Sequence, residues 1–371
     1  MHWLAFGTFD VERHPRVAVL IDGLRASGDE VAVVNAPLRL STAERVAMLR
    51  QPWRLPVLAW RLAGCWTKLI IGARRHQRVD AVLVGYLGHF DVRLARLLFR
   101  RTPIVLDHLV SAAGTARDRG LAGDGGLKQR LMRWIDRGAL RSADLVVVDT
   151  DAQAETLPAA AAPRAVVVPV GAGDEWFRRG AERPERADHS VKVVFVGLFT
   201  PLHGTETIGA ALAALADDDR VEVTMVGTGQ DYARCRELAA ANPRVTWLDW
   251  VPGAELPDLV AAHDVSLGIF GTTDKALRVV PTKAYQGLAA GCAVVTSDTA
   301  PQRAALDDAA LLVPPGDPEA LAAALRGLAA DRGRLAALKT RGYALASARY
   351  RPTETVHALR ERARPHAKVG P

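Results

Sequence analysis

The sequence predicts an α/β protein made of two Rossmann-like domains, each with a doubly wound parallel sheet. Short apolar stretches alternate with helical stretches along most of the 371 residues. Most apolar stretches are hydrophobic at every position, which suits strands covered on both faces. The chain is also too long for one ordinary core, and its pattern stops once, between residues 171 and 190. Two domains in series account for all three observations.

The first series of elements defines an N-terminal domain over residues 1–175. Strands are expected at 2–6, 30–34, 81–85, 104–106, 145–148 and 166–168. Helices are expected between them, including 15–26 and helical segments within 42–75. Strand–helix repetition with short links is typical of a parallel sheet with helices on both faces.

The second series defines a C-terminal domain over residues 190–348, after a polar stretch at 171–190 that we interpret as the interdomain linker. Its strands are expected at 193–196, 221–226, 245–248, 265–270, 293–296 and 311–313. A helical segment at 349–371 is long enough to cross back to the first domain. Because ligands of such sheets bind beyond the carboxyl ends of the strands, we expect the domains to face each other across a cleft.

The composition of the chain limits the classes of binding partner and the cellular compartment that we expect. The net charge of +7 favours an anionic partner, although an arginine-rich surface alone would also produce it. Only three cysteines occur, too far apart for a disulfide framework or a zinc motif, which indicates a reducing compartment. The start resembles a strand rather than a signal peptide, and no apolar run could span a bilayer. We therefore expect a cytoplasmic protein, with peripheral contact at the inner face of a membrane.

The stretch from 264 to 298 predicts a phosphate-binding site. It reads as a buried strand, a basic loop, a helix bracketed by Pro281 and Gly291, and a second buried strand. A loop that enters a helix from the carboxyl end of a parallel strand offers free N–H groups and the positive end of the helix dipole. Cations and hydroxyls gather there: Thr273, Lys275, Arg278, Thr282 and Lys283.

A second candidate loop follows the strand that ends at 196. Gly197 would let a ligand approach the backbone, and Gly204 opens the next helix. His203 could donate to a phosphate oxygen, or the segment could be a tight turn with a surface histidine. Farther along, Trp250 could stack on a nucleobase or pack in the core.

Two weaker motifs have simpler explanations. Gly227 and Gly229 follow a strand, but Tyr232 replaces the third glycine of a dinucleotide fingerprint. Asp249 lies where a ribose-binding acid would be, so a nicotinamide-dependent enzyme stays a rival. The acidic run 217–219 superficially fits an Asp-x-Asp metal motif, but it lies in a turn at the amino end of a strand. We predict no metal site.

In the first domain, Asp107 and His108 end a strand and are the candidate catalytic residues. They could orient a substrate hydroxyl or stabilise positive charge, or Asp107 could only cap a loop. The following loop, 111–126, is long enough to cover a substrate. Residues 50–78 contain seven basic residues, no acid and three tryptophans, as in helices that lie on anionic lipid. An amphipathic helix docked on its own sheet is the alternative.

These residues resemble the GT-B glycosyltransferases, in particular the retaining group 1, family 4-like enzymes of bacterial surface-glycan and natural-product synthesis. The resemblance covers nearly the whole chain. The stretches that carry it are VVFVGLFTPLHG, VTMVGTG, WLDWVPGAELPDLVAAHDVSLGIFG and VPTKAYQGLAAGCAVVTSD. The opening GTFDVERHPR is similar to the acceptor loop of that group and implies acceptor contacts at Gly7, Thr8 and Phe9.

The resemblance implies transfer of a sugar from a nucleoside-diphosphate donor to an acceptor hydroxyl, with retention of configuration and without a metal or other cofactor. Gly197 and Gly204 would flank the diphosphate, and His108, or Asp107 beside it, lies near the family's sugar-binding histidine. Gln286 takes the place of a glutamate that usually binds the ribose.

Other positions depart from the family pattern. Arg278 replaces a second glutamate, which touches the donor sugar, while His203 and Leu198 replace a lysine and an arginine that bind phosphate. Positive charge would then return through Lys275, Arg278 and Lys283. The missing acids also fit a catalytically silent GT-B scaffold protein that binds nucleotide. A nucleotide-sugar epimerase is a further alternative, and no nucleic-acid-binding module is recognisable.

Overall fold

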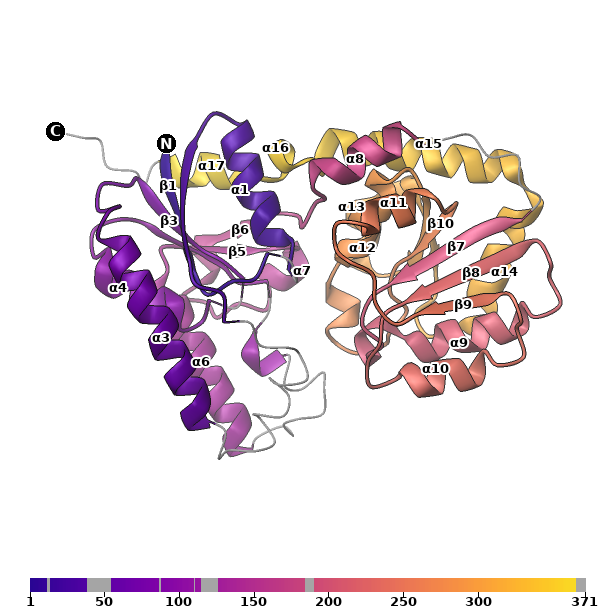
Figure 1. Ribbon diagram of the computed structural model, residues 1–371, viewed down its shortest axis with the longest axis horizontal. Coiled ribbons are helices and arrows are strands. Elements are labelled where there is room, and N and C mark those ends of the chain that lie inside the picture. The colour runs from indigo at the N-terminus through magenta and orange to yellow at the C-terminus, as the bar shows by residue number, and fades with distance from the viewer. Residues whose placement is uncertain are drawn as a thin grey trace. The chain divides into compact units, whose positions relative to one another are not determined.

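The computed structural model describes residues 1–11, 14–38, 55–86, 88–109, 111–114, 126–183 and 190–364. The chain forms two compact units (Figure 1). Unit 1 contains Met1–Pro169 and the segment that begins at Thr355, and unit 2 contains Val170–Glu354. Each unit has a six-stranded, all-parallel sheet with helices on both faces, which confirms the predicted α/β class.

The sheet of unit 1 has the order β2-β1-β3-β4-β5-β6. Its strands are β1 (His2–Gly7), β2 (Glu30–Asn35), β3 (Ala81–Val84), β4 (Ile104–Asp107), β5 (Leu145–Val148) and β6 (Ala165–Val167). The direction in which strands are added reverses between β1 and β3. The carboxyl ends of these two strands therefore form the topological switch point, where ligands of such sheets bind.

Two helical layers cover this sheet. On one face, α1 (Arg16–Ala26) and α17 (His357–Ala363) share a core with Trp3, Leu83 and Val147. On the other face lie α3 (Leu55–Ala73), α4 (Asp91–Leu98) and α6 (Leu127–Ser142). Short elements complete the unit: α7 (Asp151–Ala154) and η2 (Ala162–Arg164). Within the described ranges no helix, α3 included, is long and apolar enough to cross a bilayer.

The sheet of unit 2 has the order β12-β11-β10-β7-β8-β9. Its strands are β7 (Val191–Val196), β8 (Val221–Val226), β9 (Val245–Leu248), β10 (Val265–Leu267), β11 (Ala293–Ser297) and β12 (Ala310–Val313). Here the switch point lies between β7 and β10. Each of these strands leads into one of the two candidate phosphate loops.

Helices also cover both faces of this second sheet. One core contains residues of α9 (Thr205–Ala214), α10 (Tyr232–Leu238), α14 (Pro318–Ala330) and α15 (Arg332–Arg349). From the opposite face α12 (Thr282–Ala289) contacts β10 and β11. Its Gly287 has no room for a side chain, because a Cβ there would lie 2.7 Å from the Cβ of Ser266 on β10. The remaining elements are α11 (Leu256–Ala261), α13 (Ala300–Leu306), α16 (Pro352–Thr355), η3 (Pro201–His203), η4 (Ala276–Arg278) and η5 (Asp307–Ala309).

The interpretation of residues 171–190 as a linker is corrected by α8 (Asp174–Ala181), which packs against α11 and α12 within unit 2. Trp176 and Phe177 anchor this helix in the core. Acidic residues occupy its first turn and basic residues its last, which complements the helix dipole. Eight residues are too few to show a sustained period, so the polar composition dominated the prediction.

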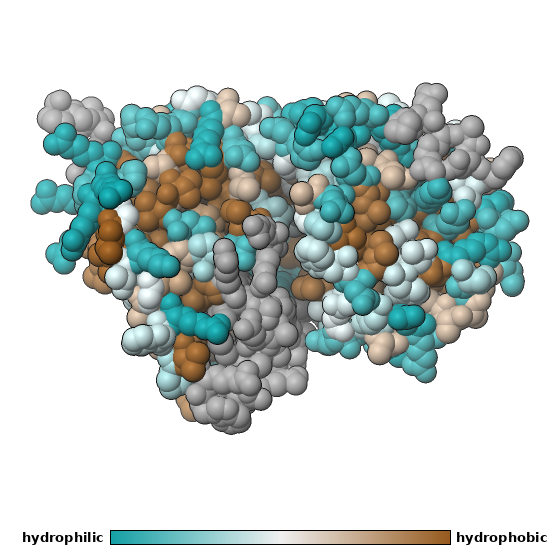
Figure 2. All heavy atoms as spheres, viewed as in Figure 1, coloured by the Kyte–Doolittle hydropathy of each residue, from teal (hydrophilic) through white to brown (hydrophobic). Residues whose placement is uncertain are grey.

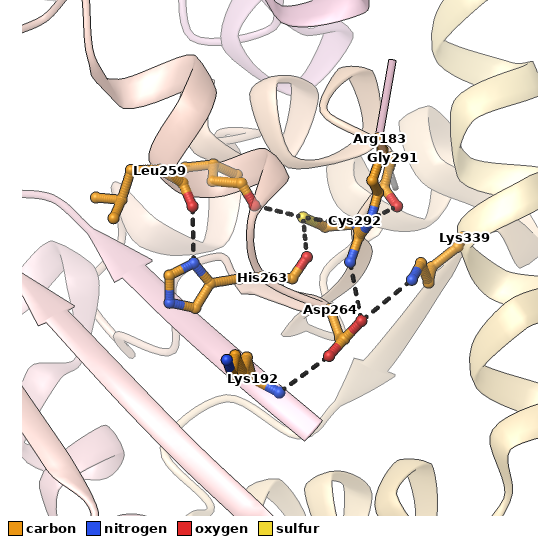
Figure 3. A network of polar contacts seen from close by, with 9 residues as sticks. Arg183, Lys192, Leu259, His263, Asp264, Gly291, Cys292 and Lys339 are labelled. Carbon is orange, nitrogen blue, oxygen red and sulfur yellow. Dashed lines mark hydrogen bonds and ion pairs between the residues drawn. The ribbon is translucent and has the colours of Figure 1, made fainter. Parts of the chain in front are cut away.

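The amino end of the unit 2 sheet is held by a network of polar contacts around Asp264 (Figure 3). This carboxylate accepts hydrogen bonds from Arg183 at 2.9 Å, from Lys339 at 3.2 Å and from the backbone N–H of Lys192 at 3.1 Å. Burial alone would raise the pKa of Asp264, but these donors lower it below its usual value. The network joins β7, β10 and α15 at the end of the sheet opposite to the candidate site.

Candidate functional site

The carboxyl end of β7 meets the first turn of α12 in unit 2. Gly197 follows β7, and a Cβ at this position would lie 2.5 Å from the Nζ of Lys283. The lysine is only 9% exposed, and its Nζ lies 3.9 Å from the centre of the Phe195 ring. Within the described part of the chain, this Nζ has no hydrogen-bond partner.

The environment of Lys283 leaves its charge poorly compensated. Burial lowers its pKa well below the usual value for a lysine. The Phe195 ring offers only a cation–π contact, which is weaker than pairing with an anion. A buried ammonium group without a partner is costly, so an anionic ligand at this place would supply the interaction that the chain lacks.

The loop from β7 to α9 packs closely on the chain that follows β10. Gly204 has φ +63°, and a Cβ there would lie 2.4 Å from the carbonyl carbon of Phe270. The N–H of Phe270 donates to the carbonyl of His203 at 3.0 Å. Next along the chain, the Thr205 hydroxyl is buried without a hydrogen-bond partner at the start of α9. Two helix N-termini, those of α9 and α12, therefore begin at the switch point of the sheet.

His203 is turned back onto its own loop. Its Nδ1 donates to the carbonyl oxygen of Leu198, so this nitrogen carries the proton. The imidazole also lies 6.0 Å from the Phe195 ring, centre to centre. The position of His203 beside Phe195 keeps it in the neighbourhood of Lys283.

The loop between β10 and α12 carries the remaining predicted cations. Lys275 caps η4, and Arg278 ends it, half exposed and 4.0 Å from the carboxylate of Asp274. Thr282 and Gln286 are separated by one helical turn on α12 and lie on the same side of it. Of the predicted cations, Lys283 alone lies against the glycine that follows β7.

Beyond β9, Trp250 is 75% exposed. Trp250 therefore does not pack in the core. Trp247 packs against the core instead, and the centre of its ring lies 5.8 Å from the centre of the Tyr232 ring. The Tyr232 hydroxyl donates to Asp249 at 2.9 Å, so this carboxylate already has a partner within the chain. Trp250 is left with an open ring that a planar ligand could cover.

Close packing explains the two glycines after β8. Gly227 has φ +118°, and a Cβ there would lie 2.0 Å from the carbonyl oxygen of Gly197. At Gly229 a Cβ would lie 2.3 Å from the carbonyl oxygen of Phe199. Both glycines allow this loop to pack on the loop after β7, and this role requires no dinucleotide.

The acidic run 217–219 forms a turn before β8. Asp218 accepts hydrogen bonds from the backbone and the guanidinium of Arg220, at 3.1 and 2.9 Å. In the ranges that the structure describes, this run included, no group of three or more His, Cys, Asp or Glu residues could hold a metal ion.

In unit 1 the structure places Asp107 in a buried ion pair with Arg16. The distance between Oδ1 and Nε is 2.8 Å, and Arg16 also donates to the carbonyls of Val168 and Pro169. Burial raises the pKa of Asp107, and the Arg16 charge offsets this only in part. The pair joins the carboxyl end of β4 to α1 and to the chain after β6, so Asp107 has an evident positioning role.

His108 belongs to a second polar cluster at the same edge. Its ring lies 5.5 Å from the ring of His89, and His89 is 3.1 Å from the carboxylate of Asp136 on α6. Asp136 in turn accepts from the N–H groups of Ala112 and Ala113. Burial, together with repulsion from His89, lowers the pKa of His108 to about 4. The imidazole is therefore neutral near pH 7.

Sequence reasoning missed His89 and Asp136. His89 follows β3 within five residues, so the rule that strand ends carry ligands could have found it. Asp136 lies inside a helix otherwise rich in arginine, and only the tertiary contact reveals its role.

The predicted acceptor loop closes onto α4. Both the N–H and the hydroxyl of Thr8 donate to Asp91, each at 2.7 Å, and the Trp66 indole donates to the other carboxylate oxygen at 2.9 Å. A Cβ at Gly7 would lie 3.1 Å from the same carboxylate, and Phe9 is buried. The loop is thus fixed by Asp91 of α4, and Trp66 of α3 in turn holds the Asp91 carboxylate. Most of the other candidate loop, 111–126, lies outside the described residues.

Comparison with known protein families identifies both halves of the chain. Residues 14–173 match the glycosyl transferase 4-like domain. Residues 190–331 match the family described as glycosyl transferases group 1. No curated protein sequence matches the chain significantly.

Solved structures with a similar fold cover nearly the whole chain. HepE of Anabaena, in complex with UDP, has a TM-score of 0.65 and 16% identity, with 97% of this chain and 98% of that one covered. Sucrose-phosphate synthase of Thermosynechococcus elongatus has a TM-score of 0.69 and 16% identity, with 98% of both chains covered. A glycosyltransferase of Rickettsia africae has a TM-score of 0.66 and 11% identity, with 100% and 99% covered.

Proposed function

We propose, given that this chain belongs to the GT-B glycosyltransferases, that it transfers a sugar from a nucleoside-diphosphate donor to an acceptor hydroxyl. The acceptor would be a surface glycan, a glycolipid or a natural product. The observation that carries the proposal is the buried, unpartnered Nζ of Lys283 against Gly197 at the switch point of unit 2. HepE structures that contain UDP, UDP-glucose or glucose support the choice of donor class.

Unit 2 would bind the donor. The diphosphate would accept hydrogen bonds from Lys283 and from the backbone at the starts of α9 and α12. Cationic side chains of the neighbouring loops would add positive charge: His203, Lys275 and Arg278. Gln286 would donate to a ribose hydroxyl in place of the acid expected at this position. The exposed ring of Trp250 would stack on the base.

Unit 1 would contribute the sugar and acceptor contacts. His108 is neutral near pH 7, so it is suited to hydrogen-bond a sugar hydroxyl rather than to act as an acid. Asp107 would hold the end of β4 through Arg16, as a positioning residue. The loop Gly7–Phe9, fixed by Asp91, would contact the acceptor.

The proposal includes retention of configuration, with the acceptor attacking the face from which the nucleotide leaves. A phosphate oxygen of the donor would take the acceptor proton. Lys283 and the two helix N-termini would stabilise the leaving-group charge, so the proposal needs no divalent cation. Activity should therefore persist when the enzyme is assayed in a chelator.

The protein would work in a reducing, cytoplasmic compartment, in peripheral contact with anionic lipid at the inner face of a membrane. Buried free thiols at Cys235 and Cys292 support the compartment. Exposed Val57 and Trp60 on α3 support the lipid contact. Arg50, Trp53 and Arg54, which belong to the same predicted segment, lie outside the described residues.

Lys283→Met tests the donor site. A charge-assisted hydrogen bond contributes about 1.5–3 kcal/mol, so affinity for nucleoside diphosphates should fall roughly 10- to 100-fold in titration calorimetry. Lys192→Met, at the amino end of the same sheet, is the matched control and should bind as the wild type does. Equal affinities of the wild type and the Lys283 variant across a panel of nucleoside diphosphates would contradict the assignment.

A catalytically silent binding protein is the second candidate, favoured by Gln286 and Arg278 at positions where the family carries acids. It would bind a nucleoside diphosphate with Lys283 yet release none from any activated sugar. Mass spectrometry of reactions with a nucleotide-sugar library separates the two candidates, because only the transferase yields a glycosylated product.

A further inference from the structure

The N-terminal half of α6 exposes an unusual set of apolar side chains. Leu127 is 83% exposed, Trp134 is 60% exposed and Leu131 is half exposed. Their spacing of four and three residues places them on one stripe of the helix. Asp136, Ala139 and Leu140 are buried on the other side of α6. The stripe therefore faces away from the sheet.

The outer side of α3 carries a similar stripe, which runs from near its start to its last turn. Trp60 is 82% exposed, and Val57 and Ile71 are more than half exposed. Trp66 and Leu69 occupy the inner side of this helix, where Trp66 donates to Asp91. Sequence reasoning treated the tryptophans of this region as one group, whereas the structure turns Trp66 inward and Trp60 outward.

The two stripes lie on one layer of unit 1. Both helices pack on the same face of the sheet, with α4 in contact with each of them (Figure 1). On α4 itself, Leu97 is also exposed. Each of α3 and α6 runs from the carboxyl end of one strand to the amino end of the next, so both begin at the edge that carries His108. Figure 2 shows hydrophobic and hydrophilic side chains intermixed on this side of unit 1.

Within the described residues of α3 and α6, the exposed charges around these stripes have a single sign. The described part of α3 contains no acidic residue and carries Arg61 and Lys68. The only acid of α6 is Asp136, which is buried against His89. Five exposed cations surround the apolar stripe of α6: Lys128, Arg130, Arg133, Arg137 and Arg141. One of the α4 cations, Arg93, covers part of the Trp134 ring at 4.7 Å.

We infer that α3, α4 and α6 form a face that docks on an anionic phospholipid bilayer. We name it the α3–α6 face and define it by Val57, Trp60, Leu127, Leu131 and Trp134. Exposed tryptophan and leucine among cations, with no exposed acid on the described parts of α3 and α6, suit the boundary between headgroups and acyl chains. This inference deepens the lipid contact included in the proposed function, moves its main anchor to α6, and can be tested without nucleotide.

Vesicle flotation of the full chain tests the docking. The wild type should bind phosphatidylcholine vesicles that contain phosphatidylglycerol and should not bind phosphatidylcholine alone. The double variant Leu131→Ser/Trp134→Ser should bind anionic vesicles roughly tenfold more weakly or worse, because it removes most of the apolar area of the α6 stripe. Arg130→Glu/Arg137→Glu should weaken binding to a similar degree, and added salt should weaken that of the wild type.

The matched control is Leu198→Ser/Trp250→Ser, which removes an equally exposed leucine and tryptophan from unit 2. It should bind vesicles as the wild type does. Equal binding of the wild type and the α6 variants, or of the two vesicle types, would overturn the inference. Light scattering could also overturn the inference. If the wild type is a dimer and the Leu131→Ser/Trp134→Ser variant is a monomer, a second copy of the chain covers the face.

Titration of the α6 variants with UDP separates this inference from the proposed function. The α6 variants should keep the wild-type affinity, because the donor site lies in unit 2, and a wild-type circular dichroism spectrum and urea unfolding curve show that unit 1 of these variants is folded. If the wild type binds vesicles but not nucleoside diphosphates, the docking face is supported and the transferase function is contradicted. A wild type that binds nucleoside diphosphates but not vesicles would contradict only the docking face.

Discussion

The two ends of the unit 2 sheet bury charge in opposite ways. At the amino end, Asp264 is surrounded by donors from Arg183, Lys339 and the backbone of Lys192 (Figure 3). At the carboxyl end, Lys283 is buried against Gly197 with no hydrogen-bond partner in the described chain. Burial is similar at the two ends, so the number of partners distinguishes them.

This difference separates a charge that stabilises the fold from a charge that waits for a ligand. A buried ion with several good partners recovers its desolvation cost within the protein. A buried ion without partners keeps that cost until something binds. Evolution tolerates such a cost mainly at functional sites, where stability is exchanged for affinity.

The largest effect is expected at the amino end. Asp264→Ala leaves Arg183 and Lys339 facing each other without a counter-charge, and removing one partner of a buried pair costs about 3–5 kcal/mol. Urea unfolding at pH 7 measures the loss. Asp298→Ala, which removes an exposed pair with Arg303, is the control and should cost about 0–1 kcal/mol.

The loss of unfolding free energy caused by Asp264→Ala should change with pH in one direction. The pKa of Asp264 is lowered in the folded state, so its contribution is present above the ordinary aspartate pKa and is lost as pH falls through the folded value. The difference in unfolding free energy between the wild type and Asp264→Ala should therefore shrink in acid. Equal losses for Asp264→Ala and Asp298→Ala at pH 7 would show that partner number does not matter here.

A smaller effect of opposite sign is expected at the carboxyl end. Lys283→Met replaces a buried amine by an apolar group of similar length, so it should raise the free energy of unfolding by about 1–3 kcal/mol. The same substitution should weaken nucleotide binding. A variant that is more stable but binds less would confirm the exchange of stability for affinity, whereas a destabilised variant would contradict it.

The lowered pKa of Lys283 determines how the stability difference between the wild type and Lys283→Met changes with pH. Between the folded pKa and the ordinary lysine value, the unfolded state binds more protons, so the stability of the wild type rises with pH. The advantage of Lys283→Met should therefore shrink as pH rises through this window. A constant difference from pH 7 to 10 would indicate that Lys283 keeps an ordinary pKa.

The contrast between the two ends also explains what the sequence could predict. The sheets followed from apolar strands at regular intervals. The position of Lys283 in a first helical turn followed from a helix that begins at Pro281, after a buried strand and a basic loop. Both signals are local. The glycines at 197 and 204 were found for the same reason, because a loop after a strand limits where a ligand can approach.

What the sequence could not predict depends on distant contacts. Arg16 meets Asp107 across 91 positions, and His89 meets Asp136 only because α4 and α6 pack together. No period or spacing marks such pairs. The burial of Lys283 was also not predictable, since the cations of its loop look alike in sequence while one alone lies under Gly197.

The smallest signal is a proton taken up when nucleotide binds. At pH 8.5 a free nucleoside diphosphate is fully ionised, because its last phosphate pKa is about 6. A diphosphate beside Lys283 raises the lowered pKa of the amine, so binding should take up as much as about one proton. Titration calorimetry in Bicine and in Tris measures this number, since the two buffers differ in ionisation enthalpy and neither contains phosphate.

Lys283→Arg is the control for this measurement, because a guanidinium stays charged at pH 8.5 and should bind without proton uptake. His203→Ala keeps the lysine and should take up protons as the wild type does. Equal heats for the wild type in both buffers would mean that Lys283 is already charged before the anion arrives. Burial would then not lower the pKa of Lys283 as proposed, and the exchange of stability for affinity at this end of the sheet would be contradicted.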